Sequence, residues 1–347
     1  MNEMRALHEE PHGAYARPDD GAGESYLTVY LEPFIAQLGQ DDVTDIYVNR
    51  PGEVWVERLG GRIACEPAPD LTEALLWRLS RQVASLSNQG ISRAEPLLSA
   101  RLPDGSRIQV IAPPATRGPL ALAIRKHVSA DLSLDDYVAS GSFEGTVAGE
   151  PVDRAADRLI DLYRQANWPA LLREAVRGKR TIVVSGGTST GKTTFLNALL
   201  REVDSQERLI LIEDTPELRI AHENAVGLVS VRGELGETRV SAEDLLIASL
   251  RMRPDRIILG ELRGKEAATF LRAINTGHPG SLTTIHANSP DHAIGQLALL
   301  ASQGLAMSKE DAADYIRRTV DIVVQLKHEA GRRSVASVAM PMAMRGA

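Results

Sequence analysis

The sequence contains a single cysteine, Cys65, among its 347 residues. One thiol cannot form a disulfide within the chain, and it cannot supply the several sulfur ligands of a multi-cysteine zinc site. We interpret Cys65 as a buried packing residue. Internal repeats and low-complexity tracts are absent as well. Apolar residues make up 43% of the chain and charged residues 24%, which is typical of an ordinary globular protein.

Long hydrophobic runs are also missing from the sequence. None approaches the roughly 20 residues that a membrane-spanning helix needs. The first 25 residues lack the apolar core of a signal peptide. We therefore expect residues 1–25 to be a disordered, solvated tail and the protein to be cytoplasmic.

An excess of positive charge is absent too. The chain has 46 Asp and Glu residues against 39 Lys and Arg, which gives a formal net charge of −7. This balance argues against broad electrostatic binding to nucleic acid, so direct nucleic-acid binding is not expected. A net negative charge is still compatible with a local basic stripe on the surface of an assembled oligomeric ring.

The length of the chain predicts about two domains. The first is a small α+β domain over residues 26–128, built around an antiparallel sheet. Residues 129–155 are acidic and weakly periodic, and we interpret them as a linker with about one helical turn. Residues 156–347 alternate strand and helix patterns, which predicts an α/β domain with a mostly parallel sheet flanked by helices.

The stretch "SGGTSTGKTT" at 185–194 matches the phosphate-binding loop G-x-x-x-x-G-K-[ST]. A β-branched run precedes it and a helical apolar pattern follows it, which is the strand–loop–helix context that this motif requires. Lys192 is expected to reach the β- and γ-phosphates of ATP, and the Thr193 hydroxyl to bind Mg²⁺. The candidate nucleotide-binding residues are Gly186, Gly187, Thr188, Ser189, Thr190, Gly191, Lys192, Thr193 and Thr194.

Two later strand patterns end in carboxylates. "RLILIEDTPEL" (208–218) contains Glu213 and Asp214, and "DRIILGELRG" (255–264) contains Gly260 and Glu261. Carboxylates at strand ends near a phosphate-binding loop suit Mg²⁺ and the attacking water. We assign Glu261 as the general base, Glu213 as a further catalytic carboxylate, and Asp214 as a carboxylate that contacts the metal indirectly, through the metal's own ligands. A surface carboxylate at a strand end remains the alternative for Glu261 and Asp214.

The segment "TGHPGSLTTIHANS" (276–289) holds His278 and His286. No cluster of metal ligands surrounds them, so a metal site is not expected here. We interpret His286 as a polar sensor of the γ-phosphate, with a satisfied core histidine as the alternative. The same two interpretations are open for His278.

These four segments, in their order and spacing, resemble the boxes of the traffic ATPases that serve type II and type IV secretion. The quoted motifs are "GGTSTGKT", "LIEDTPEL", "LRMRPDRIILGELRG" and "TGHPGSLTTIHANS". Within that superfamily, "IYVNRPGEVWVE" (46–57) and "LPDGSRIQVIAPP" (102–114) resemble the N-terminal domain of type IV secretion and conjugal-transfer ATPases. The resemblance implies a RecA-like P-loop ATPase domain after the smaller α+β domain, with nucleotide bound between the two.

The same resemblance implies a homo-hexameric ring at the cytoplasmic face of the inner membrane. It would touch the membrane surface peripherally, bind inner-membrane components of a type IV secretion system, and use ATP for pilus assembly and substrate transfer. Arginines of the N-terminal domain and the subunit junction contact phosphates in that family. The matching catalytic candidates are Arg107 and Arg125, with Arg101, Arg253 and Arg263 as further ones.

Two other functions stay open at this point. One is an assembly or retraction ATPase of type IV pili or type II secretion, although a single cysteine excludes the tetracysteine zinc insert that many of those assembly ATPases carry. The other is a DNA-binding module that uses ATP as an assembly switch. The acidic balance and the lack of a helix-turn-helix pattern argue against it.

Overall fold

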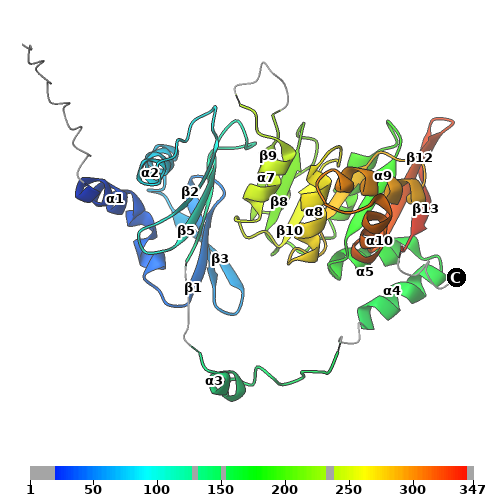
Figure 1. Ribbon diagram of the computed structural model, residues 1–347, viewed down its shortest axis with the longest axis horizontal. Coiled ribbons are helices and arrows are strands. Elements are labelled where there is room, and N and C mark those ends of the chain that lie inside the picture. Colours follow the sequence, from blue (N-terminus) through cyan, green and yellow to red (C-terminus); the bar gives the residue numbers. More distant parts are fainter. Residues whose placement is uncertain (1–19, 127–131, 150–153, 232–237, 342–347) are drawn as a thin grey trace, which may run out of the picture.

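The computed structural model describes residues 20–126, 132–149, 154–231 and 238–341 (Figure 1). These residues form two β-sheets, each covered by helices. The first sheet has six strands and the second has seven. The expected fold class, an α/β RecA-like ATPase domain after a smaller α+β domain, is confirmed.

The N-terminal sheet is antiparallel throughout, in the order β3-β2-β1-β6-β5-β4. Its inward residues alternate with outward ones, so that one face packs against two helices around Phe34 and Leu79. The elements are α1 (Asp20–Leu38), β1 (Val43–Val48), β2 (Gly52–Arg58), β3 (Arg62–Ala68), α2 (Glu73–Leu86), β4 (Leu97–Arg101), β5 (Arg107–Ile111) and β6 (Ala121–Arg125).

Two details of the N-terminal region differ from the sequence-based expectation. The helix α1 begins at Asp20, so it includes residues 20–25, which were assigned to the tail; residues 1–19 lie outside the described part. Cys65 is exposed, because β3 is an edge strand of the sheet with most of its side chains toward solvent.

The predicted linker contains one short helix, α3 (Leu134–Ala139). Ser133 begins it with a capping box, since its hydroxyl accepts from the Asp136 amide while the Asp136 carboxylate accepts from the Ser133 amide. No residue of α3 is buried, and Figure 1 shows the helix lying apart from both sheets. Residues 129–131 and 150–153 of the linker lie outside the described residues. The next helix, α4, starts at Arg154.

The C-terminal sheet has the order β13-β12-β7-β11-β10-β8-β9, with every pair parallel except β12–β13. Two further apolar clusters cover its two faces, one with α4, α5 and α6 and the other with α7 to α10. The strands are β7 (Ile182–Gly186), β8 (Leu209–Glu213), β9 (Ala225–Val229), β10 (Arg256–Leu259), β11 (Leu282–Ile285), β12 (Ile322–Glu329) and β13 (Arg332–Ala339). The helices are α4 (Arg154–Arg164), α5 (Trp168–Arg177), α6 (Lys192–Leu200), α7 (Ala242–Ser249), α8 (Glu266–Asn275), α9 (Pro290–Ser302) and α10 (Lys309–Thr319).

The N-terminal sheet docks on the β8–β9 edge of the C-terminal sheet, and Tyr47 and Ile111 join the apolar cluster there (Figure 1). Arg208, immediately before β8, lies at the centre of this contact and is fully buried. Its guanidinium donates to the Asn49 side chain at 2.7 Å and to the Met252 carbonyl at 2.9 Å. It also lies 4.1 Å from the centre of the Tyr47 ring. Burial lowers the pKa of Arg208 to about 10, so it stays charged at neutral pH.

Arg208→Met should therefore lower the free energy of unfolding by about 3 kcal/mol, because it leaves buried amide and carbonyl oxygens without their donor. Urea denaturation of the full chain measures this loss. Arg201→Met is the matched control, since Arg201 is exposed and its replacement should cost about 0.5 kcal/mol or less. Equal effects of the two substitutions would show that Arg208 does not hold the two sheets together.

Candidate nucleotide-binding site

The loop between β7 and α6 has the backbone of a phosphate-binding loop. Gly191 caps α6 with a φ of 91°, in the left-handed region that favours glycine. Gly186 ends β7, where an added Cβ would lie 2.4 Å from the Thr190 hydroxyl oxygen. The two glycines thus permit a tight turn that points backbone N–H groups and the N-terminus of α6 into one cavity.

Lys192 lies over its own loop. Its ammonium donates to the carbonyl oxygens of Gly186 at 3.1 Å and Gly187 at 3.3 Å, and it is 3.7 Å from a carboxylate oxygen of Glu261. Carbonyl oxygens are neutral acceptors, and phosphate oxygens form stronger, charge-assisted bonds with an ammonium. The lysine is therefore held near the place where a triphosphate would bind.

The parallel strands bring the other motifs to the same edge of the sheet. Glu213 ends β8, Glu261 follows β10 and His286 follows β11. The sheet order places β11 between the loop strand β7 and the Glu261 strand β10. The strand beside β7 on this side therefore carries His286, and the strands ending in carboxylates lie one and two positions further along.

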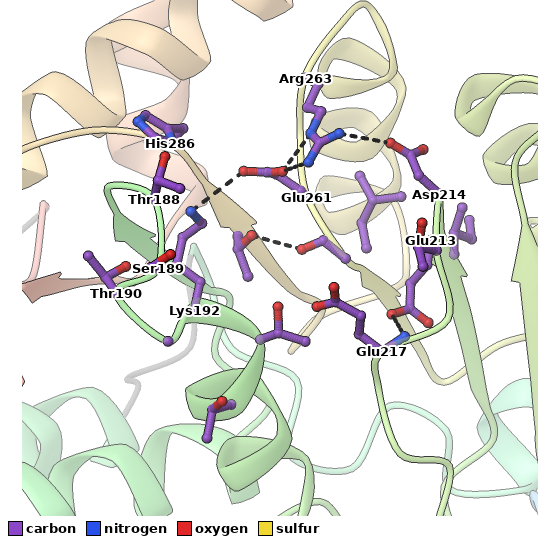
Figure 2. A pocket seen from close by; sticks show the side chains of 18 of the residues that line it. Thr188, Ser189, Thr190, Lys192, Glu213, Asp214, Glu217, Glu261, Arg263 and His286 are labelled. Carbon is purple, nitrogen blue, oxygen red and sulfur yellow. Dashed lines mark hydrogen bonds and ion pairs between the residues drawn. The ribbon is translucent and has the colours of Figure 1, made fainter. Parts of the chain in front are cut away.

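Glu261 lies between two cations. In addition to Lys192, it pairs with Arg263, whose Nε donates to a Glu261 oxygen at 2.5 Å. Arg263 reaches Asp214 at 3.2 Å as well, and Asp214 accepts from the Ser230 hydroxyl at 2.6 Å. Figure 2 shows this row from Lys192 through Glu261 and Arg263 to Asp214. Two of the three carboxylates predicted for the site, Glu261 and Asp214, are thus joined by Arg263 at the cavity.

Gly260 directly follows β10 and lies close to β8. A Cβ at this position would lie 2.9 Å from the Glu213 side chain and 3.5 Å from the Ile212 carbonyl oxygen. The close approach of β10 to β8 therefore leaves no room for a side chain here. Glu261, one residue later, is the carboxylate that reaches the cavity from β10.

Glu213 is almost completely buried, and its side chain holds the loop that follows β8. One carboxylate oxygen accepts from the backbone N–H groups of Glu217 and Leu218 at 2.9 Å each. The other oxygen pairs with Arg117 of the β5–β6 connection. Glu213 lines the cavity wall, but both of its carboxylate oxygens already bind other groups of the protein. Its direct catalytic role stays a prediction.

The two histidines lie beyond opposite ends of the central strand β11. His286 is exposed and lines the cavity beside Thr188 (Figure 2). His278 precedes β11, and its Nδ1 lies 2.9 Å from the Pro254 carbonyl oxygen, which precedes β10. Partial burial lowers the pKa of His278. His278 therefore bonds within the fold and does not line the cavity, and a role for it at the nucleotide site stays a prediction.

The cavity has a volume of about 510 Å³, of the size that ligand sites in proteins have. Thr193 lines it together with Lys192, Glu261 and Asp214. A hydroxyl beside carboxylates is an oxygen donor set that suits Mg²⁺ held through a triphosphate. Among the described residues, no group of three or more His, Cys, Asp or Glu side chains forms a metal site of its own. The residues fit a metal that enters with its nucleotide.

Several known proteins are similar to this chain in sequence and in fold. The family model of the type II/IV secretion system proteins matches residues 160–334. The chain is 36% identical to the type IV secretion system protein VirB11 of Bartonella quintana over 324 residues, which cover 89% of this chain and 91% of that protein. It is 37% identical to the type IV secretion system protein PtlH of Bordetella pertussis over 332 residues, covering 93% and 96%.

The chain belongs to the type II/IV secretion system family. A crystal structure agrees with this: that of the VirB11 ATPase of the Brucella suis type IV secretion system, in complex with sulphate. The TM-score is 0.87 at 34% identity, over 94% of this chain and 97% of that one. The family recognised from the four sequence boxes is thereby confirmed.

Arg107 and Arg125 do not reach the nucleotide cavity of their own chain. They pair directly across β5 and β6, both exposed, and Arg101 continues the row on β4. Arg125 lies 3.9 Å from Asp45. None of the three lines the cavity, because the N-terminal sheet docks on the β9 edge. Which subunit's nucleotide these arginines serve was left open by the sequence, and their catalytic role stays a prediction.

The other predicted arginines divide between the two regions. Arg263 lines the cavity, as described above. Arg253 instead binds the buried Glu57 of β2 at 2.8 Å, so it serves the contact between the two sheets. Arg253 precedes β10 and Arg263 follows it, so the two arginines lie at opposite ends of the same strand.

Two charged residues of the cavity were not predicted from the sequence. Arg333 of the β12–β13 hairpin lines the cavity, and its side chain lies about 3.3 Å from where a Cβ on Gly191 would be. Glu217 lines the opposite wall. The Gly331 turn signals the hairpin in the sequence, but only the pairing of β12 with β7 brings it to the phosphate-binding loop.

Proposed function

We propose that this chain is the ATPase of a type IV secretion system, in which ATP hydrolysis drives pilus assembly and substrate transfer. The observation that carries the proposal is the cavity itself, where Lys192, Glu261, Arg263 and His286 converge on a phosphate-binding loop. The related VirB11 and PtlH proteins are type IV secretion proteins, and this favours that system over type II secretion or pilus retraction.

ATP is the substrate, and its binding changes the partners of Lys192. The ammonium leaves the Gly186 and Gly187 carbonyls and pairs with the phosphates, while the loop N–H groups bind phosphate oxygens. The Thr193 hydroxyl would hold Mg²⁺, with Asp214 behind it. When bound, the metal would neutralise charge that develops on the phosphates.

Glu261 then takes the proton of the attacking water. In the structure Lys192 lies near one carboxylate oxygen of Glu261, and Arg263 donates to the other. When Lys192 turns to the phosphates, one carboxylate oxygen is released toward the cavity. Arg263 remains and fixes the other oxygen, which orients the carboxylate for the water. His286 lies beside the loop where a γ-phosphate would end, in keeping with a sensor.

Arg107 and Arg125 act on the nucleotide of another copy in a homo-hexamer. Their row on the N-terminal sheet is exposed and turned away from the cavity of its own chain. Planar guanidinium groups suit phosphate oxygens bidentately. We place the ring at the cytoplasmic face of the inner membrane, against inner-membrane components of the secretion system. Among the described residues no helix is long and apolar enough to cross a bilayer.

Lys192→Ala should lower kcat at least about a hundredfold and weaken ATP binding, because it removes the cation that the loop brings to the transition state. Steady-state ATPase assays and equilibrium nucleotide binding measure the two effects. Lys327→Ala is the control, since this lysine of β12 is exposed, pairs with Glu329 and does not line the cavity. A kcat of Lys192→Ala within twofold of the wild type would refute the assignment of residues 185–194 as a phosphate-binding loop.

Glu261→Gln should separate chemistry from binding. We expect kcat to fall by about 10²–10⁴ while the Kd for ATP changes little, because an amide cannot accept the proton of water. Glu243→Gln is the control, as Glu243 pairs with Lys265 outside the cavity. If binding and turnover are lost together in a folded protein, Glu261 holds the metal or the structure instead.

Mixing two inactive variants tests the action of Arg107 across copies. Arg107→Ala and Lys192→Ala proteins should each be inactive alone. After subunit exchange at equal amounts, about a quarter of the sites should combine an intact loop with an intact arginine, by random pairing in a closed ring. The ATPase activity of the mixture measures this rescue. A mixture as inactive as its components would place Arg107 with its own chain or outside the reaction.

A further inference from the structure

The connection between β5 and β6 pairs with the edge of the C-terminal sheet. Thr116 forms an antiparallel bridge with Leu228 of β9. The Arg117 N–H donates to the Gly227 carbonyl at 2.8 Å, and the Val229 N–H donates to the Ala115 carbonyl at 2.9 Å. A short piece of the N-terminal domain thus extends the nucleotide-binding sheet beyond β9.

Arg117 crosses β9 from this connection to the end of β8. It passes over Gly227, where an added Cβ would lie 2.6 Å from the Arg117 Cδ. At the far end its guanidinium pairs with Glu213 and donates to the Leu218 carbonyl at 2.7 Å. The side chains of Arg117 and Glu213 are 17% and 4% exposed, so the pair is shielded from solvent.

Arg117 and Glu213 together hold the loop at 214–218 through its backbone N–H and carbonyl groups. Glu213 accepts from the N–H groups of Glu217 and Leu218, and Arg117 donates to the carbonyl of Leu218. This loop carries Asp214, Thr215 and Glu217 into the nucleotide cavity. Asp214 in turn holds Arg263, and Arg263 holds Glu261.

We propose that Arg117 is a positioning residue for ATP hydrolysis, which sets the cavity wall at residues 214–218 by neutralising and fixing Glu213. The inference rests on the proposed ATPase function. Without Arg117, Glu213 would be a buried carboxylate with no cation, facing the negative charge of a triphosphate. Its hold on the loop would weaken, and Asp214 and Arg263 would no longer fix Glu261.

Arg117→Met should therefore lower kcat by about ten- to a hundredfold, through misplacement of the groups around the water, while the Kd for ATP changes little. Arg251→Met is the matched control: Arg251 also joins the two sheets, through the Ser99 hydroxyl at 2.8 Å, but it does not line the cavity. A kcat of Arg117→Met within twofold of the wild type, or an equal loss in Arg251→Met, would overturn the proposal.

A double substitution distinguishes positioning through Glu213 from a general loss of stability. Adding Arg117→Met to Glu213→Gln should cause no further loss of kcat, because the partner through which Arg117 acts is already changed. The double variant removes both buried charges, so it should unfold at a higher urea concentration than Arg117→Met alone. Losses of kcat that multiply in the double variant would show that Arg117 acts elsewhere.

Hydrogen exchange provides a measurement that needs no turnover. The amides of Glu217 and Leu218 should exchange at least about tenfold faster in Arg117→Met, because the carboxylate that protects them is no longer fixed. They should exchange at the wild-type rate in Arg251→Met. Unchanged exchange in Arg117→Met would overturn the proposal, whereas a wild type without ATPase activity would refute the proposed function and leave this measurement to decide on Arg117.

Discussion

Parallel strands all end at the same edge of their sheet, and the site of this protein depends on that constraint. Four neighbouring strands place the phosphate-binding loop, His286, Glu261 and Glu213 along one edge, although these residues are far apart in the sequence. A ligand crevice at the carboxyl ends of the strands follows from the topology. A few side chains then set the chemistry, and Arg263 joins two of the carboxylates that line the cavity, Glu261 and Asp214.

The sequence predicted the fold class and the cavity because their signals are local. A Gly-rich loop between strand and helix patterns defines the phosphate site within ten residues, and each remaining box is a strand followed by a polar residue. The place of the β12–β13 hairpin in the sheet was not predicted, because it depends on the parallel pairing of β12 with β7, about 140 residues earlier in the chain. Arg333 enters the cavity only through that pairing.

The arginines show the limit of sequence reasoning more clearly. Arg107, Arg253 and Arg263 all matched motif positions, yet one lies on an exposed sheet face, one at the interdomain contact and one in the cavity. An arginine side chain reaches acceptors in several directions, so its partner is decided by tertiary structure. Arg117 had no motif to mark it, and its contact with Glu213 depends on how the N-terminal domain docks.

The strand β8 is fixed at both ends by contacts with the N-terminal domain. At its start, the buried Arg208 binds Asn49 and stacks on Tyr47; at its end, Glu213 pairs with Arg117. Leaving a buried charge without its partner costs much free energy. The groups of the Arg208 contact should therefore separate together, and so should those of the Arg117 contact. Any motion of the N-terminal domain away from β9 must therefore disturb the loop at 214–218 and, through Asp214 and Arg263, the carboxylate of Glu261. Rigid docking of this kind would pass a domain movement on to Glu261, the residue that we propose activates water, and a motor ATPase needs such a coupling.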